Sequence, residues 1–108
     1  MAYKAVHRHA QISARKVRPL ADLIRGKAVD DALAILRYQP QRGARLLEKV
    51  IKSALGNAED QRAPNVAGLR ILDARVDGGP MFKRLRPRAR GMAHVVKRRF
   101  SHISVEVE

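Results

Sequence analysis

The residues of this chain that most clearly predict a chemical role are lysines and arginines concentrated in one stretch. Between Pro80 and Phe100 there are eight basic side chains and no acidic one. They are Lys83, Arg84, Arg86, Arg88, Arg90, Lys97, Arg98 and Arg99. Arginine can grip a phosphate at two points and stack on a base, while lysine supplies a compact charge. Cations without neighbouring carboxylates predict binding of a polyanion rather than catalysis, with nucleic acid as the first expectation.

The whole chain shares this basic character. Its 108 residues carry 23 Lys and Arg against 10 Asp and Glu, a net charge of +13. The length fits a single domain, and 45% apolar residues are too many for a disordered tail. The absence of cysteine excludes disulfides, thiolate zinc sites and cysteine nucleophiles. We find neither an apolar run of about 18 residues nor the apolar core of a signal peptide, and therefore expect a soluble intracellular protein.

The other polar residues form no convincing catalytic or metal site. Two strand histidines, His7 and His9, would share a face at this spacing, but two imidazoles alone make a weak metal site. The acidic pairs of the chain are better explained by charge balance, in a helix's first turn or beside Arg70 and Arg75. These pairs are Asp30 with Asp31, and Asp73 with Asp77. We expect no metal, no cofactor, no small-molecule substrate and no enzymatic activity.

Apolar periodicity predicts three helices after a short N-terminal edge strand at Tyr3–His9. The first helix follows an N-cap at Ser13 and ends at Gly26, with Pro19 expected to bend it. Its apolar face is formed by Val17, Leu20, Ala21 and Ile24. The second helix is predicted at Val29–Tyr38, and the longest at about Gln41–Glu59.

The hydrophobic period then changes from helical to alternating. In Leu69–Asp77 the residues expected to face the core are Leu72, Ala74 and Val76; in Ser101–Glu108 they are Ile103, Val105 and Val107. We expect these segments to pair as antiparallel strands, because a short chain leaves no room for a parallel crossover. The predicted fold class is therefore α+β, with three helices and a small antiparallel three-stranded sheet.

The basic stretch is predicted to extend the two strands beyond this core. We call residues 78–100 the arm and residues 1–77 with 101–108 the head. Pro87–Gly91 would form the turn of the arm and Gly78–Pro80 a bend at its base, giving a projection of roughly 30 Å. An isolated two-stranded hairpin is marginal in water, so we expect the arm to be ordered only among phosphates. Two alternatives for this stretch are a solvated run of charges and a helix lying on a membrane surface. Apolar residues interleaved with the charges disfavour the solvated run. Pro87 and Gly91 would interrupt a membrane-surface helix and so disfavour it.

Several motifs, in order along nearly the whole chain, resemble one family. The arm sequence KRLRPRARG (residues 83–91) is followed by Lys97-Arg98 and by SHISV (101–105). Upstream, SARKVR (13–18), ADLIRGK (21–27), Ser53-Ala54 and NAE (57–59) complete the pattern. Together they resemble large-subunit ribosomal protein twenty-two of the bacterial type.

The resemblance implies a structural protein that binds large-subunit ribosomal RNA and assists early subunit assembly in the cytoplasm. Neighbouring ribosomal proteins would adjoin the head, and the arm's tip would help line the tunnel through which nascent peptides leave. The implied RNA-binding residues are Arg15, Lys16, Arg18, Lys83, Arg84, Arg86, Arg88, Arg90, Lys97, Arg98, Arg99 and His102. The implied tunnel-lining residues are Arg88, Ala89, Arg90, Gly91 and Met92. The runner-up is a DNA-bending architectural protein with a basic β-arm, in which a proline near the tip wedges between base steps.

Overall fold

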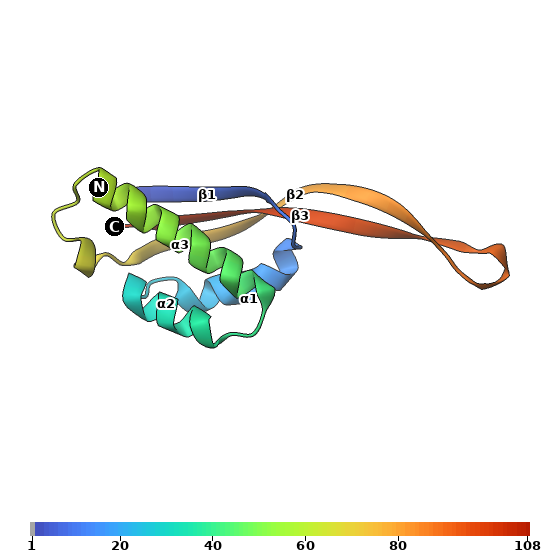
Figure 1. The fold of residues 1–108 in the computed structure, drawn as a ribbon, viewed down its shortest axis with the longest axis horizontal. Coiled ribbons are helices and arrows are strands. Elements are labelled where there is room, and N and C mark those ends of the chain that lie inside the picture. The colour runs from blue at the N-terminus through green and yellow to red at the C-terminus, as the bar shows by residue number, and fades with distance from the viewer. Residues whose placement is uncertain (1) are drawn as a thin grey trace.

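Three helices cover one face of a three-stranded antiparallel sheet, and two of the strands run far beyond it (Figure 1). The computed structural model describes residues 2–108. Its elements are β1 (Tyr3–Ala10), α1 (Ala14–Ile24), α2 (Val29–Tyr38), α3 (Arg42–Asp60), a 3₁₀ turn η1 (Val66–Gly68), β2 (Ile71–Pro87), a 3₁₀ turn η2 (Ala89–Gly91) and β3 (Ala93–Val107). The strand order is β1-β3-β2, so β3 is central. The predicted α+β class and all three helices are confirmed.

The long arm gives the molecule an elongated shape. Its principal extents are 64 × 25 × 16 Å, and its radius of gyration is 16.8 Å. A compact chain of this length would have a radius of gyration near 13 Å. None of the helices in residues 2–108 combines the length and apolarity that crossing a bilayer requires.

The hydrophobic core lies between the helices and the inner face of the sheet. Helix α3 packs on β1 and β3, while α1 packs on β2. The inward residues of α1 and of β3 are those that the periodicity predicts, and all are buried. At the start of α3, Gly43 lets α1 and α3 approach each other closely, because a Cβ at this position would lie 3.2 Å from side-chain atoms of Leu20 and Val17 on α1.

The inward set predicted for β2 is wrong at one position. Leu72 was expected in the core but is 52% exposed, and Ile71 is buried in its place. The cause is a bulge: Ile71 pairs with Val107 and Asp73 with Glu106, so Leu72 is an extra residue in β2. One inserted residue shifts the alternation to the opposite face of the sheet.

Two polar predictions also differ in detail. Ser13 lies at the N-cap of α1, but its side chain makes no capping hydrogen bond. Asp73 lies 3.6 Å from the guanidinium of Arg25, whereas Arg70 was the expected partner. Arg25 also donates to the carbonyl oxygen of Ala74 at 2.6 Å, so it ties the end of α1 to β2.

Arg45 and Glu48 on α3 fasten the C-terminus of α2. Arg45 donates hydrogen bonds to the carbonyl oxygens of Leu36, Arg37 and Gln39 at the end of α2, where a helix leaves carbonyl groups without intrahelical partners. Glu48 lies within 4 Å of three cations, on Arg37, Arg45 and Lys52. The hydrogen bond from Lys52, helped by Arg45 and opposed by partial desolvation, holds the pKa of Glu48 below its ordinary value of 4.5.

The two helical glycines of α3 provide a matched stability test. We expect Gly56→Ala to raise the free energy of unfolding by about 0.5–1 kcal/mol, because its site is exposed and open. Gly43→Ala should fall short of that gain, since its methyl group meets Leu20 and Val17. Urea denaturation of both variants measures the difference. Equal stabilisation would contradict the close crossing of α1 and α3.

The lowered pKa of Glu48 predicts a pH-dependent contribution to stability. The contribution is present above the unfolded-state pKa, near 4.5, and is lost as the pH falls through the lower folded-state pKa. Glu48→Gln should therefore be less stable than the parent chain at pH 6, and the difference should shrink as the pH falls through the lowered folded-state pKa of Glu48. Urea denaturation over a series of acidic pH values checks this, and a difference that does not shrink with falling pH would show that Glu48 acts through packing instead.

Candidate nucleic-acid interface

The arm is a continuous antiparallel ladder from its base to its turn. Past the core, β2 and β3 pair from Met81 with Arg99 to Pro87 with Ala93. The predicted bend is confirmed as a register shift between Gly78 and Met81. The predicted turn is confirmed as η2, closed by a hydrogen bond of 2.6 Å from the Arg88 N–H to the Met92 carbonyl. The ladder thus carries the cations away from the core in the order that its register sets.

Both faces of the arm are cationic. Residues directly opposite each other in an antiparallel ladder share a face. One face carries Lys83, Lys97 and Arg99, and the other carries Arg84, Arg86 and Arg98. Lys83 and Lys97 lie directly opposite each other, a like-charge pair that destabilises the free ribbon. A polyanion can therefore meet charge from either side of the arm.

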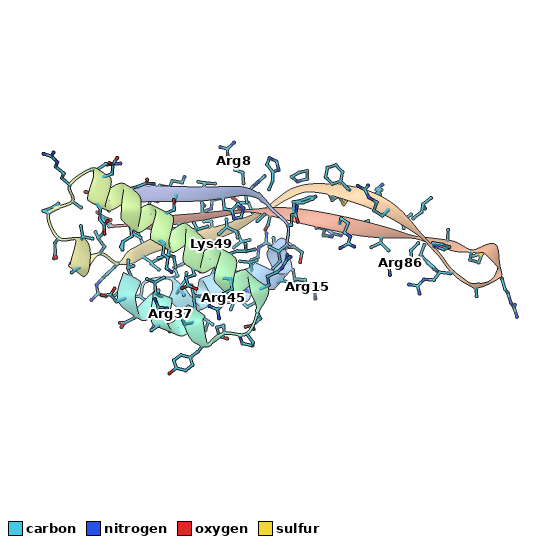
Figure 2. All side chains as sticks on the ribbon, in the orientation of Figure 1. Arg8, Arg15, Arg37, Arg45, Lys49 and Arg86 are labelled. Atoms are coloured by element: carbon cyan, nitrogen blue, oxygen red, sulfur yellow. The ribbon has the colours of Figure 1, made fainter. Side chains whose placement is uncertain are left out.

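Within residues 2–108, no acidic side chain forms an ion pair with an arm cation. All eight basic residues of the arm are exposed, and Arg86 projects freely in Figure 2. Arg84 makes local contacts only: it donates to the Lys83 carbonyl at 3.1 Å and lies 5.5 Å from the ring centre of Phe82. The arm therefore lacks internal neutralisation and presents its full charge to solvent.

The turn holds Arg90 in an unfavourable backbone conformation. Its φ of 58° and ψ of 34° lie in the left-handed region, as does the φ of 73° at Gly91. A side chain in this region costs on the order of 1 kcal/mol, which glycine would avoid. The apex therefore places a guanidinium where glycine would adopt the same backbone conformation at lower cost.

The predicted site residues of the head fall into two groups. Arg15 and Lys16 are exposed at the start of α1, and Figure 2 labels Arg15 there. Arg18 instead donates through Nε to the Val76 carbonyl at 3.1 Å, so it helps join α1 to β2. His102 is half-buried, and its Nδ1 accepts a hydrogen bond of 3.1 Å from the backbone N–H of His9. Roles for these residues in RNA binding stay predictions.

The expectation that His7 and His9 share a face is wrong. A register shift follows His7, and His9 has a φ of 59°, so the strand turns between them. His7 pairs with Ile103 of the core, whereas the His9 ring makes an edge contact with His102 at 5.0 Å. Across the described part of the chain, no three His, Cys, Asp or Glu side chains gather as a metal site would require.

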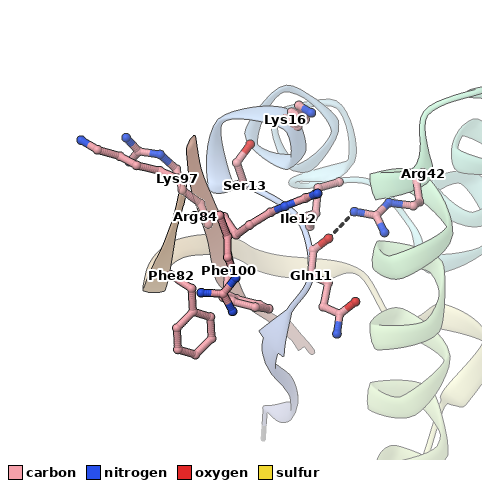
Figure 3. A pocket seen from close by; sticks show the side chains of 11 residues that line it. Gln11, Ile12, Ser13, Lys16, Arg42, Phe82, Arg84, Lys97 and Phe100 are labelled. Atoms are coloured by element: carbon pink, nitrogen blue, oxygen red, sulfur yellow. Dashed lines mark hydrogen bonds between the residues drawn. The ribbon is translucent and has the colours of Figure 1, made fainter. Parts of the chain in front are cut away.

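Some exposed residues near the interface escaped sequence reasoning. Arg42 begins α3 beside the base of the arm, and its guanidinium donates to the Gln11 carbonyl (Figure 3). Arg8 is exposed on β1, where Figure 2 shows it on the outer side of the strand. The alternation of Arg8 with the residues beside it was the available signal for its exposure. The position of Arg42 depends on a long-range contact, for which the sequence has no signal.

A helix-covered antiparallel sheet with a projecting, unopposed cationic ribbon defines a class of basic nucleic-acid-binding proteins with a β-arm. Comparison with known families then makes the assignment specific. The model of the family "Ribosomal protein L22p/L17e" matches residues 5–108, and the chain belongs to this family. The family consists of structural, non-enzymatic ribosomal proteins, so the resemblance noted in the sequence is confirmed.

Individual relatives agree with the family match over most of their length. Large ribosomal subunit protein uL22 of Rhodopirellula baltica is 60% identical, over 95% of this chain and 91% of the relative. The protein of the same name from Caldicellulosiruptor saccharolyticus is 52% identical, over 94% and 83% of the two chains. That from Pelotomaculum thermopropionicum is 50% identical, over 99% and 95%.

The exposed ladder predicts a large difference in amide exchange along one strand. In the free chain, amides of residues 93–99 should exchange far faster than those of Ile103 and Val105, because no core covers the arm. Added large-subunit ribosomal RNA should slow exchange in the arm. Hydrogen exchange followed by NMR measures both. Arm amides as protected as Ile103 in the free chain would contradict the marginal stability of the ribbon.

Proposed function

We propose that this structural ribosomal protein inserts its arm into large-subunit ribosomal RNA and contributes to subunit assembly. The head would remain beside neighbouring ribosomal proteins. The observation that carries the proposal is the arm itself: eight exposed cations on a two-stranded ladder and its turn, with no carboxylate paired to them in residues 2–108. Family membership supports large-subunit ribosomal RNA as the proposed nucleic acid, because the relatives are named as proteins of the large ribosomal subunit.

Phosphate neutralisation would supply most of the affinity. Because the arm is narrow and carries cations on both faces, it is better suited to insertion between RNA segments than to binding on one flat RNA surface. A-form RNA hides its base edges in a deep, narrow major groove, so recognition would depend on shape, phosphates and 2′-hydroxyls. Arm ordering on contact with RNA would also couple binding to the folding of the RNA around it, which is the proposed part in assembly.

The tip would line the exit tunnel and contact nascent peptides. The residues that would do so are Arg88, Ala89, Arg90, Gly91 and Met92. Met92 is 61% exposed, and Arg90 holds its strained backbone at the apex. The tip therefore presents an apolar side chain and cations together, a surface suited to peptides of varied sequence passing an RNA wall.

The DNA-bending alternative is weaker because of the position of Pro87. Pro87 pairs with Ala93 at the end of the ladder, while the apex is formed by Ala89–Gly91. For Pro87 to act as the wedge between base steps, it would have to lie at the leading point of the arm. The proline is therefore placed to end β2 rather than to enter DNA.

The proposal predicts a strong salt dependence that resides in the arm. If about six phosphates are met, the slope of log K against log salt should be on the order of −4 to −5. Replacing Arg84, Arg86, Arg88 and Arg90 by Gln should reduce its magnitude by about 3. A variant of equal net charge, with Lys4, Lys27, Lys49 and Arg62 replaced by Gln, should keep most of the slope. Filter binding to large-subunit ribosomal RNA measures all three proteins.

Two further outcomes would contradict the proposal. The tagged chain should cosediment with large subunits through high salt, and a chain found wholly outside ribosomes would refute its role. Competition with duplex DNA provides the second check: preference for the duplex over structured ribosomal RNA would support the DNA-bending alternative.

A further inference from the structure

A basic groove lies where the arm meets the head. It encloses about 680 Å³, and Figure 3 shows side chains from both parts of the chain around it. The head contributes the turn Gln11–Ser13, Lys16 of α1 and Arg42 of α3. The arm contributes Phe82, Arg84, Lys97, Arg98, Arg99 and Phe100. Six of the lining side chains are cationic, and no acidic side chain lines the groove.

The groove exists because β1 leaves the sheet before β3 does. The last pair between these strands joins Ala10 to Ser101, and the chain then turns through Gln11–Ser13 into α1. Residues 97–100 of β3 continue along the arm without a neighbour on that side. The bond from Arg42 to the Gln11 carbonyl fixes the turn against α3. The walls on the head side are therefore held by the fold.

The aromatic residues give the groove a flat apolar surface. Phe82 and Phe100 meet edge to face, with ring centres 5.4 Å apart. Half of the Phe82 residue is exposed, although it is a large apolar side chain. These are the only two phenylalanines of the chain, and both line this groove. Cations around an exposed aromatic ring are suited to a ligand that carries both negative charge and a flat ring.

We infer that this groove binds an unpaired nucleotide of RNA, with its base on Phe82 and its phosphates among the surrounding cations. This inference rests on the proposed function and assigns the arm's base a distinct ligand. A volume of this size is within the range of about 300–1,000 Å³ typical of small-molecule sites. Stacking of bases on aromatic side chains is a general means of holding unpaired nucleotides.

Arg84 completes the stacking arrangement. Its guanidinium already lies 5.5 Å from the ring centre of Phe82. A base between them needs two contacts of about 3.5 Å, a separation near 7 Å. Arg84 is exposed and can move outward by that difference to close over the second face of the base. Lys16 and Arg42 then face the phosphates from the head, so one nucleotide would link the head to the arm.

The test compares two RNA hairpins that differ by one bulged adenosine, titrated with the full chain. The parent chain should bind the bulged hairpin at least about fivefold more tightly than the fully paired one. Phe82→Leu should reduce this ratio to near one, while Tyr38→Leu should leave it unchanged. Tyr38 is the matched control because it is an aromatic residue, 90% exposed, outside the groove.

A second variant pair separates the groove from net charge. Lys16→Gln and Lys27→Gln remove one exposed lysine each from the head, but only Lys16 lines the groove. Lys16→Gln should lower the preference for the bulged hairpin, and Lys27→Gln should not. Equal effects of the two substitutions would show that only overall charge matters, and would overturn the inference.

Ring contacts provide a readout that does not depend on affinity. In the chain labelled at phenylalanine, both ring signals should shift on addition of the bulged hairpin, with nuclear Overhauser effects between the Phe82 ring and the bulged base. Equal affinity for both hairpins, with no such effects, would overturn the inference and leave the proposed function intact. Failure to bind any RNA would instead refute the proposed function.

Discussion

The β2–β3 ladder extends beyond the hydrophobic core, and the behaviour of the molecule depends on this extension. In the head, from Val107 back to Ser101 of β3, the ladder has one buried face, formed by residues such as Ile103 and Val105. Beyond Met81 both faces are exposed and cationic, so the backbone bonds of a two-stranded ribbon must hold against charge repulsion. The strands paired in the head set the register of the arm, but the head contributes little to the stability of the arm itself. If the proposed binding holds, bound anions would supply the remaining free energy of ordering, and arm structure and ligand binding would be coupled.

Arginine has two different uses in this chain. In the head, Arg18, Arg25 and Arg45 donate to backbone carbonyls, and so join helices to strands and to one another. These guanidinium groups supply several donors each, which suits them to bonding backbone carbonyls of neighbouring elements. In the arm, the arginines lack such long-range partners among the described residues, and their donors face solvent. The net charge of +13 therefore overstates the number of cations without intramolecular partners, and the structure distinguishes arginines that join elements of the head from arginines that face solvent.

The sequence was sufficient for the helices, the strand pairing and the turn because these features follow from local pattern. Helical and alternating periods marked the elements, while Pro87 and Gly91 marked the turn. The errors occurred where one residue is added to a strand. The bulges at Leu72 and His9 reverse the faces of residues around them, and no local pattern distinguishes a bulged strand from a regular one. The groove was also beyond prediction, because it depends on where β1 departs from β3 and on the contact of Arg42 with Gln11.

The bend at the base of the arm and the groove beside it share one structural cause. A Cβ at Gly79 would lie 3.0 Å from the carbonyl oxygen of Phe100, so only glycine lets β2 pass β3 this closely. The close passage occurs within the register shift from Gly78 to Met81 and places Phe82 against Phe100. The residue that sets the arm's departure thus also builds the aromatic surface of the groove. A ligand held there, as inferred above, would touch the point at which the register shift sets the direction of the arm.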